Sequence, residues 1–299
     1  NITWGGTGKT PVTVKLAGDL LGAGKRVAVL SRGYKRKLKV NGNMIISDGR
    51  NILCDVEVAG DEPYMMAEKL KKAVILIGEN RHLSAKMAIE KFNVDVLLLD
   101  DGFQHWGLVR ELDVVCINAK NPFGNGFLIP AGILREPLSA LKRAGIIVLT
   151  NADRVTGEDL SALKQKLSLV SPAPVVLAKY SVKGVKNVFS GSPVEIDIIK
   201  NAVGFSAIGN NENFRDTLIT LGLNVKRFYP FMDHKWYVEK DLLKMLADNP
   251  ESVFITTLKD AVRFRRFQNL PKEKFFYVDI ELKITEGEEI WKEKIERFF

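Results

Sequence analysis

A glycine-rich run near the start of the chain has the residue types of a phosphate-binding loop. In such a loop, backbone N–H groups surround phosphate oxygens, a lysine reaches the β- and γ-phosphates, and a hydroxyl coordinates Mg²⁺. The usual pattern has glycine where this chain has Thr3, so a structural glycine turn followed by a surface lysine is the alternative interpretation. The favoured prediction is a site for ATP with Mg²⁺, built from Thr3, Gly5, Gly6, Thr7, Gly8, Lys9 and Thr10.

Two adjacent aspartates follow an apolar run that has the pattern of a buried strand. The run covers Val94–Leu99, and Asp100 and Asp101 come directly after it. Neighbouring carboxylates repel each other unless a cation lies close by, and P-loop enzymes place such an aspartate beside the Mg²⁺ of the nucleotide. Acids at strand ends are common, so the prediction depends on the pairing with the glycine-rich loop. We expect Thr10, Asp100 and Asp101 to hold Mg²⁺.

Asp61 and His234 could carry acid–base chemistry, although Asp61 also fits a structural role. Asp61 precedes Glu62 and Pro63, an order typical of a helix N-terminus. The residues alone therefore favour a helix cap over a catalytic base at this position. His234 lies in a predicted loop among polar and aromatic residues and follows Asp233, which makes it a candidate catalytic histidine.

Three arginines have the chemistry to bind anions, since a planar guanidinium group can bind phosphate through two hydrogen bonds. Arg32 and Arg81 each follow a predicted strand, and Arg135 lies in a predicted turn. Each could instead be a surface ion-pair partner. We expect all three to contact substrate.

The elements that position these residues follow a βα pattern. Short apolar runs alternate with helical patterns from Thr10 to about Asp153, which is typical of a largely parallel sheet with helices on both faces. Strands are predicted at Val27–Leu30, Val74–Ile77, Val94–Leu99, Val114–Ile117 and Ile146–Leu149. Helices are predicted at Thr10–Leu21 and Pro63–Leu70. The sequence therefore predicts an α/β fold of the P-loop NTPase type.

A second, smaller α/β domain is predicted after a break near residue 155. A helical pattern at Gly157–Leu169 is followed by Ser171–Pro174, whose two prolines would end any helix. Further strands are predicted at Val175–Ala178, Ala202–Ile208, Val253–Thr256 and Phe275–Val278, with a helix at Glu212–Leu221. We expect domains at residues 1–155 and 156–282, and a C-terminal helix within residues 283–299 that packs back on the first domain.

Composition limits the class of protein without selecting its partner. The 299 residues are 46% hydrophobic, which is enough for a substantial core, and the net charge of +8 would attract polyanions. Nucleic acid, an anionic membrane surface and a phosphorylated small molecule are all compatible with that charge. No apolar run approaches the roughly 20 residues that span a bilayer. Phosphate loops normally follow a buried strand, so we expect a truncated start with residues before Asn1, a membrane anchor being one option.

Several longer motifs resemble those of the tetraacyldisaccharide 4′-kinases. They occur in that family's order, from the first residue to about Ala261, and the family also has threonine at the position of Thr3. The motifs are Asn1–Pro11, Ser31–Tyr34, Gly60–Pro63, Asp100–His105, Leu128–Gly132, Leu134–Pro137 and Asp233–His234. Their joint occurrence is far more specific than the glycine-rich loop alone.

The resemblance implies transfer of the γ-phosphoryl group of ATP to the 4′-hydroxyl of a tetraacylated glucosamine disaccharide 1-phosphate, in lipid A biosynthesis. A sugar hydroxyl is a poor nucleophile at neutral pH, so a positioned base should assist it. By resemblance, Asp61 is that base and His234 its partner across a domain cleft, with Lys9 and Asp101 as further catalytic residues. The implied setting is the cytoplasmic face of the bacterial inner membrane, bound peripherally or through residues before Asn1.

Two basic clusters bear on the expected partners. Residues 34–39 form a basic run that could be a solvated loop, or could contact the substrate's 1-phosphate or anionic lipids, where each cation contributes about 1 kcal/mol. Arg263–Phe267 mixes cations with aromatic rings, and could touch lipid headgroups or form the packed face of an amphipathic helix. We expect the lipid A disaccharide 1-phosphate and an anionic inner-membrane surface as partners, with no nucleic acid and no obligate protein partner.

Two other functions stay open on the sequence alone. A P-loop ATPase or GTPase that acts as a metallochaperone or assembly factor would use the same loop and acids. A nucleic-acid-binding module would use the charge of +8. No nucleic-acid recognition motif is evident, however, and paired carboxylates beside a phosphate loop would be poorly placed for that role.

Overall fold

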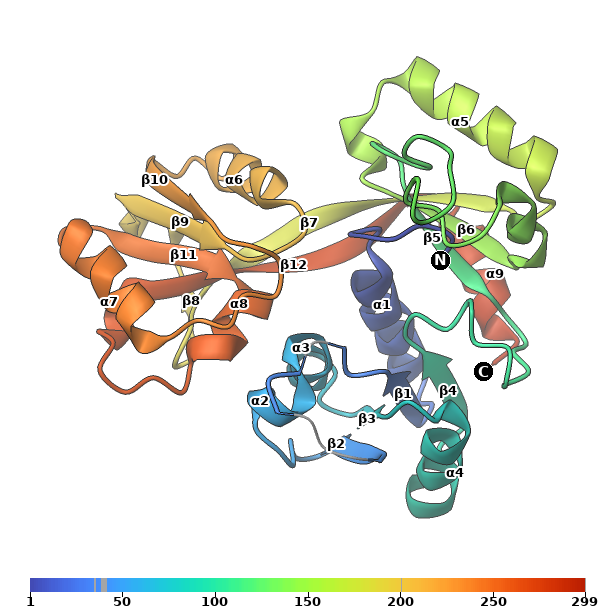
Figure 1. Ribbon diagram of the computed structural model, residues 1–299, viewed down its shortest axis with the longest axis horizontal. Helices are drawn as coiled ribbons and strands as arrows, with labels where there is room; N and C mark the ends of the chain where they lie inside the picture. The colour runs from blue at the N-terminus through green and yellow to red at the C-terminus, as the bar shows by residue number, and fades with distance from the viewer. Residues whose placement is uncertain (35, 39–41, 200, 299) are drawn as a thin grey trace.

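The computed structural model describes residues 1–34, 36–38, 42–199 and 201–298. Figure 1 shows two lobes that are joined by two long strands, β7 (Val175–Asn187) and β12 (Phe275–Glu286). Both chain ends lie in the first lobe, which also carries helix α1 (Lys9–Gly22). None of the helices in the described part of the chain is long and apolar enough to cross a lipid bilayer.

A four-stranded sheet forms one side of the first lobe. Its strands are β1 (Val27–Ser31), β2 (Met44–Asp48), β3 (Val74–Ile77) and β4 (Val96–Leu99), in the order β2-β3-β1-β4. Strand β1 pairs in parallel with β3 and β4, and β2 is antiparallel to β3. Because successive side chains of a strand point to opposite faces, this sheet presents two apolar faces.

Helices cover both of these faces. Helix α4 (Arg81–Phe92) packs on one face through Ala85 and Ala88. On the other face lie α1 and α3 (Asp61–Lys69), the latter preceded by the short helix α2 (Val56–Ala59). The same apolar cluster contains Val148 and Val176 of the second sheet. Helix α1 therefore lies between the two sheets, and its first turn carries the end of the glycine-rich loop.

The second sheet extends through both lobes. Its order is β10-β9-β11-β12-β7-β6-β5, with the short β8 (Pro193–Val194) paired to β7. The remaining strands are β5 (Val114–Asn118), β6 (Ile146–Thr150), β9 (Ala202–Ser206), β10 (Val225–Pro230) and β11 (Val253–Thr257). Neighbours pair in parallel, except for β12 with β7 and β8 with β7. The antiparallel β7–β12 ribbon is the connection between the lobes.

The other helices complete the two cores. Helix α5 (Gly157–Val170) packs on β5 and β6 in the first lobe through Leu163 and Leu167. In the second lobe, α6 (Asn211–Thr220) covers one face of the sheet, whereas α7 (Glu239–Asp248) and α8 (Leu258–Phe264) cover the other. Helix α9 (Glu288–Glu296) returns to the first lobe, where Trp291 joins the core and its Nε1 donates to Asp19 at 2.8 Å.

The predicted fold class is confirmed as a mostly parallel α/β structure with flanking helices. The predicted strands are present, but β7 and β12 run far beyond the predicted ends at Ala178 and Val278. The sequence prediction placed no element at β2, β10 or α7, and it offered a helix at α8 only as one interpretation of the Arg263–Phe267 cluster. The domain division near residue 155 stays a proposal, and the packing of α5 in the first lobe places that helix with the earlier residues.

Candidate active site

The glycine-rich loop is held in place by a second segment of the first lobe. Thr3 pairs with Leu134 in an isolated bridge, and the Trp4 amide donates to the carbonyl oxygen of Ile133 at 2.8 Å. Ile2 is fully buried in the core beneath. The loop therefore starts from an extended segment that these contacts hold in place, and this segment lies outside strands β1 to β12.

Gly8 allows the loop to turn into α1. Its φ is +86°, a left-handed conformation that glycine adopts without strain. A Cβ at this position would lie 2.6 Å from the Tyr180 hydroxyl oxygen and 2.9 Å from a methyl carbon of Thr150, so a larger residue does not fit. The Thr150 hydroxyl also donates to the Thr7 carbonyl oxygen at 3.0 Å. Two strands of the second sheet, β6 and β7, thus hold the back of the loop.

Asp101 lies beside the lysine at the end of the glycine-rich loop. It follows β4 with a φ of +56°, a conformation that is uncommon for residues other than glycine. Lys9 Nζ lies 3.9 Å from Asp101 Oδ1, and Nη1 of Arg135 donates to both carboxylate oxygens at 2.9 and 2.8 Å. Burial would raise the pKa of Asp101, but the charges of Lys9 and Arg135 hold this pKa below its ordinary value.

Asp100 lies beside Asp101 but forms no ion pair with any side chain in the described part of the chain. It is 5% exposed, and its Oδ1 accepts a hydrogen bond from the Thr13 hydroxyl at 3.3 Å. Burial, followed by the negative charges of Glu62 and Asp101, raises the pKa of Asp100 to about 7. A buried carboxylate with this pKa is in a site that favours an added cation.

The donor set here fits Mg²⁺. Thr10 supplies a hydroxyl at the start of α1, and Asp100 and Asp101 supply the carboxylate oxygens that Mg²⁺ prefers. Among the residues that the structure describes, no three His, Cys, Asp or Glu side chains gather into a metal-binding group. Mg²⁺ commonly keeps several waters and binds one or two carboxylates together with substrate phosphates. The residues present therefore suit a nucleotide-bound Mg²⁺ rather than a site built from protein ligands alone.

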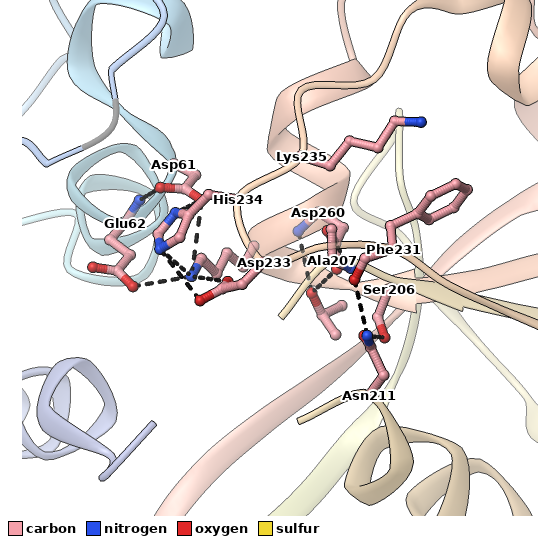
Figure 2. Close-up of polar contacts among 12 residues, drawn as sticks. Asp61, Glu62, Ser206, Ala207, Asn211, Phe231, Asp233, His234, Lys235 and Asp260 are labelled. Atoms are coloured by element: carbon pink, nitrogen blue, oxygen red, sulfur yellow. Dashed lines mark hydrogen bonds and ion pairs between the residues drawn. The ribbon is translucent and has the colours of Figure 1, made fainter. Parts of the chain in front are cut away.

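Asp61 and His234 meet at the junction of the two lobes. Asp61 is the first residue of α3, whereas His234 lies in the loop after β10 with a φ of +64°. His234 Nδ1 is 3.0 Å from Asp61 Oδ2. Figure 2 shows Asp61 and Glu62 on α3 facing Asp233 and His234 of this loop. The structure thus brings together two residues that are 173 positions apart in sequence.

Asp61 does not cap its helix in the usual way, because the cap position belongs to Gly60 and carries no side-chain hydrogen bond. Its Oδ1 accepts from the Glu62 amide at 2.9 Å. Burial alone would raise the pKa of Asp61, which is 3% exposed. The hydrogen bond from His234 and the charges of Arg263 and Lys259 instead hold the pKa of Asp61 well below its usual range. Asp61 is therefore ionised at neutral pH.

Helix α8 supplies two cations to this junction. Lys259 Nζ lies 3.1 Å from Glu62 Oε1 and 3.4 Å from His234 Nε2. Arg263 is fully buried and donates to Asp61. The sequence did not single out Lys259. For the Arg263–Phe267 cluster it left two interpretations open: Arg263 and Phe264 are fully buried, as a packed helix face requires, whereas Arg266 is exposed and Phe267 is half-buried. The spacing of Lys259 and Arg263, four apart on one helix face, was the available signal.

The three predicted substrate arginines lie in different environments. Arg32 is exposed and lines the cleft described below, and Arg135 lines it as well while bound to Asp101. Arg81 is 5% exposed, and its Nη1 donates to the Gly78 carbonyl oxygen, so it does not line the cleft. Of the basic run at residues 34–39, Lys35 and Lys39 lie outside the described residues, and Lys37 is paired with Glu57.

A single large cleft of about 2470 Å³ connects these groups. Its wall includes Gly5 to Thr10, both aspartates of the β4 end, and from the lobe junction Glu62, His234 and Lys259. Asp61 lies behind this wall, in contact with His234 rather than with the open space. A triphosphate at the loop and an acceptor at the junction could therefore share one cavity.

Comparisons with known proteins agree with this arrangement. The model of the family described as Tetraacyldisaccharide-1-P 4′-kinase matches residues 1–299. The tetraacyldisaccharide 4′-kinase of Elusimicrobium minutum is 38% identical over 289 residues, which cover 95% of this chain and 77% of that protein. The tetraacyldisaccharide 4′-kinase of Halothermothrix orenii is 39% identical over 281 residues, covering 89% of this chain and 73% of that protein.

A solved structure is similar over the whole chain. It is a crystal structure of the "apo" form of LpxK from Aquifex aeolicus in complex with ATP. The two share 33% identity with a TM-score of 0.78, and the match covers 100% of this chain and 86% of that one. The likeness extends to both lobes and to the ribbon between them.

Proposed function

Since this chain belongs to the tetraacyldisaccharide-1-phosphate 4′-kinase family, we propose that its loop, its paired aspartates and its Asp61–His234 pair form one phosphoryl-transfer site. The enzyme transfers the γ-phosphoryl group of ATP to the 4′-hydroxyl of a tetraacylated glucosamine disaccharide 1-phosphate in lipid A biosynthesis. The observation that carries the proposed site is the shared cleft, whose wall holds the loop, both acids and His234. The alternative of a metallochaperone or assembly ATPase or GTPase is set aside by the family membership.

We propose that the loop binds the triphosphate through its backbone. Gly5, Gly6, Thr7 and Gly8 would turn amide groups toward the phosphates, with Thr3 fixing the start of the loop, and α1 would add its positive N-terminal end. Lys9 would reach the transferred group, because its ammonium already faces the cleft beside Asp101. The Lys9 charge would then stabilise the negative charge that spreads over the transferred oxygens.

Thr10, Asp100 and Asp101 would hold Mg²⁺ next to the triphosphate. When bound, Mg²⁺ neutralises charge on the β- and γ-phosphate oxygens. The raised pKa of Asp100 supports this assignment, since a cation at this position would remove the cost of ionising a buried acid beside Glu62 and Asp101. Arg135 would keep Asp101 oriented toward the loop through its contacts with both carboxylate oxygens.

Asp61 and His234 would deprotonate the acceptor hydroxyl as a unit. As the 4′-hydroxyl oxygen attacks the γ-phosphorus, His234 would take the hydroxyl proton on Nε2 while its Nδ1 proton passes to Asp61 Oδ2, so that Asp61 serves as the base through the imidazole ring. His234 lines the cleft and is the member of the pair that meets the sugar, whereas Asp61 lies behind it and is 3% exposed. The short distance between His234 Nδ1 and Asp61 Oδ2, 3.0 Å, supports their joint action.

The acylated acceptor would approach from the membrane. We propose that the enzyme works at the cytoplasmic face of the inner membrane, where anionic lipids attract basic side chains. Arg32 is exposed at the cleft and would contact an anionic part of the substrate. Arg81 is a weaker candidate for this role because its guanidinium is buried against the Gly78 carbonyl.

The proposed base is tested by Asp61→Asn, measured as transfer of label from γ-labelled ATP to purified lipid A disaccharide 1-phosphate. Loss of a positioned base is expected to lower kcat by about 10²- to 10⁴-fold. Asp55→Asn is the matched control. Asp55 lies six residues before Asp61, is exposed, and makes no helix-cap hydrogen bond with its side chain. The Asp55→Asn enzyme should therefore have parental activity. An Asp61→Asn enzyme with near-parental kcat would rule out Asp61 as the base.

A further inference from the structure

A fully buried arginine holds the carboxylate of Asp61 from the second lobe. Arg263 is 0% exposed, and its Nε donates to Asp61 Oδ2 at 3.0 Å while Nη2 donates to the same oxygen. His234 also contacts Oδ2. Three contacts at hydrogen-bond distance therefore converge on one oxygen, whereas Oδ1, among the described residues, accepts from the neighbouring Glu62 amide alone.

The other end of the guanidinium group is anchored within the second lobe. Arg263 Nη1 donates to Asp260 Oδ1 at 2.9 Å and to the Lys235 carbonyl oxygen at 3.1 Å. Lys235 directly follows His234, so one side chain contacts both Asp61 and the loop that carries its partner. Arg263 thereby connects the first lobe, the His234 loop and helix α8.

Asp260 is itself fixed. It is fully buried and accepts from the Ala207 amide and the Tyr237 hydroxyl, each at 3.0 Å. Thr257 caps α8: its hydroxyl accepts from the Asp260 amide at 3.1 Å and donates to Asp260 Oδ2 at 2.7 Å. Asp260 and Arg263 are three residues apart on this helix, so they meet on one face. Contacts within the second lobe therefore fix the position of Arg263 independently of its contact with Asp61.

We propose that Arg263 is a positioning residue for phosphoryl transfer: it bridges Asp61 of the first lobe to Asp260 of the second, and so fixes the carboxylate that holds His234. This inference rests on the proposed role of the Asp61–His234 pair. It explains why Asp61 stays aligned with His234 although the two come from separate lobes. A planar guanidinium group can bind two acids at once, which a lysine cannot do in the same geometry.

The charge of Arg263 also sets the pH range of the pair. The titratable and charged groups around Asp61 are His234 and Asp233 from the loop, Lys259, Asp260 and Arg263 from α8, Glu62 from its own helix, and Tyr34, whose ring meets that of His234. Burial raises the pKa of Asp61, and His234, Arg263 and Lys259 lower it. Loss of Arg263 should therefore make Asp61 easier to protonate.

The test compares Arg263→Lys and Arg263→Met with the parent in the labelled-ATP assay on the full chain. We expect kcat to fall about tenfold or more in both variants, since a charge-assisted hydrogen bond contributes enough for such a change. KM for ATP should stay within about twofold, because Arg263 lies outside the cleft wall that holds the loop. The acid limb of the pH profile of kcat should move to higher pH, and further for methionine than for lysine, because the positive charge of Arg263 lowers the pKa of Asp61.

Arg265→Lys is the matched control. Arg265, directly after α8, also contacts the first lobe, through Glu68, but it forms no hydrogen bond or ion pair with Asp61 or His234. Its kcat and acid limb should match the parent. A fall in kcat without movement of the acid limb in the Arg263 variants would overturn the proposal, because a merely structural role predicts that result. So would a parental kcat in Arg263→Lys. If Arg263→Met does not fold, the lysine variant alone decides by the same criteria.

Asp61→Asn in the same series separates this inference from the proposed base. An active Asp61→Asn enzyme would overturn the base assignment, and the positioning role would fall with it. An inactive Asp61→Asn enzyme beside parental Arg263 variants would overturn the positioning role alone. Both proposals would be supported by an inactive Asp61→Asn enzyme together with Arg263 variants that have a lower kcat and an acid limb at higher pH.

Discussion

Asp61 and Asp100 are both buried carboxylates on the same lobe, yet their environments are opposite. Asp61 is surrounded by His234, Arg263 and Lys259, which hold its pKa well below the usual range despite burial. Asp100 is surrounded by Glu62 and Asp101 in addition to its burial, and its pKa rises to about 7. Asp61 is therefore ion-paired within the protein, whereas Asp100 forms no ion pair in the described part of the chain.

The difference also separates the origins of the partners. The side chains that shift the pKa of Asp100 all come from the first lobe, whereas the cations around Asp61 all come from the second. In the proposed site, phosphate and metal binding would therefore be completed within one lobe, whereas the Asp61–His234 pair forms where the lobes meet. Three predictions, taken from the largest effect to the smallest, test this contrast.

The largest effect is expected at the ligand side for Lys9→Ala. Loss of a charge that stabilises the transferred phosphoryl group should lower kcat/KM by about 10²- to 10³-fold. Stability should barely change, because Lys9 and Asp101 are partly exposed and 3.9 Å apart, a pair worth about 0–1 kcal/mol. Labelled-ATP kinetics and thermal melts measure the two quantities. Lys86→Ala, an exposed lysine paired with Glu90, is the control. A large drop in melting temperature would show that Lys9 belongs to the protein's own framework.

The second prediction sharpens the contrast through Asp100→Asn. The folded pKa of Asp100, about 7, lies above its ordinary value of 3.8, so the folded state binds this proton more tightly than the unfolded state. The stability that this gives is present below pH 4 and is lost as the pH rises to about 7. The gap between the two values corresponds to about 4 kcal/mol at most. Metal-free Asp100→Asn should therefore melt at a higher temperature than the parent at pH 8.

The same variant should lose its response to Mg²⁺. In the parent, Mg²⁺ with ATP should raise the melting temperature more at pH 8 than at pH 6, because the proton on Asp100 competes with the metal. Asp95→Asn, an aspartate paired with Arg26 at the surface, should keep the parental response. Destabilisation of metal-free Asp100→Asn at pH 8 would mean that the carboxylate already has a partner in the protein, which contradicts the contrast.

The sequence predicted the glycine-rich loop and the acids after β4 better than it predicted the lobe junction. The loop, α1 and the acids after β4 are each readable from local patterns, because glycine spacing, a helical pattern and a buried strand are properties of short segments. The lobe junction has no such local pattern. Asp61 and Arg263 are 202 residues apart, and only the pairing of β7 with β12 and the path of α8 bring them together.

Polar surfaces explain what was missed elsewhere. Strand β7 continues beyond Ala178 through half-buried residues with three lysines, so its hydrophobic run ends long before the strand does. Helix α7 has only Leu242 and Met245 fully buried, which is a weak signal for a helix. The residues alone favoured a helix cap for Asp61 and made His234 a candidate catalytic histidine, whereas the joint role expected of the two came from the family resemblance. One sequence is therefore enough to predict the phosphate site, whereas the residues that position Asp61 become evident only from the tertiary structure.

The smallest effect is expected for Thr257→Ala, which loosens the second-lobe side of the contrast without removing a charge. Thr257 is the N-cap of α8 and also donates to Asp260, so the substitution should lower the free energy of unfolding by about 1 kcal/mol. Thr257→Ser keeps the hydroxyl and should lose much less. Because α8 carries Lys259 and Arg263 to Asp61, kcat in the alanine variant should fall while KM for ATP stays constant. Denaturant melts and the labelled-ATP assay measure both. Equal stability of the alanine and serine variants would show that the cap does not hold this helix, and the rigid support assigned to Asp61 would then need another source.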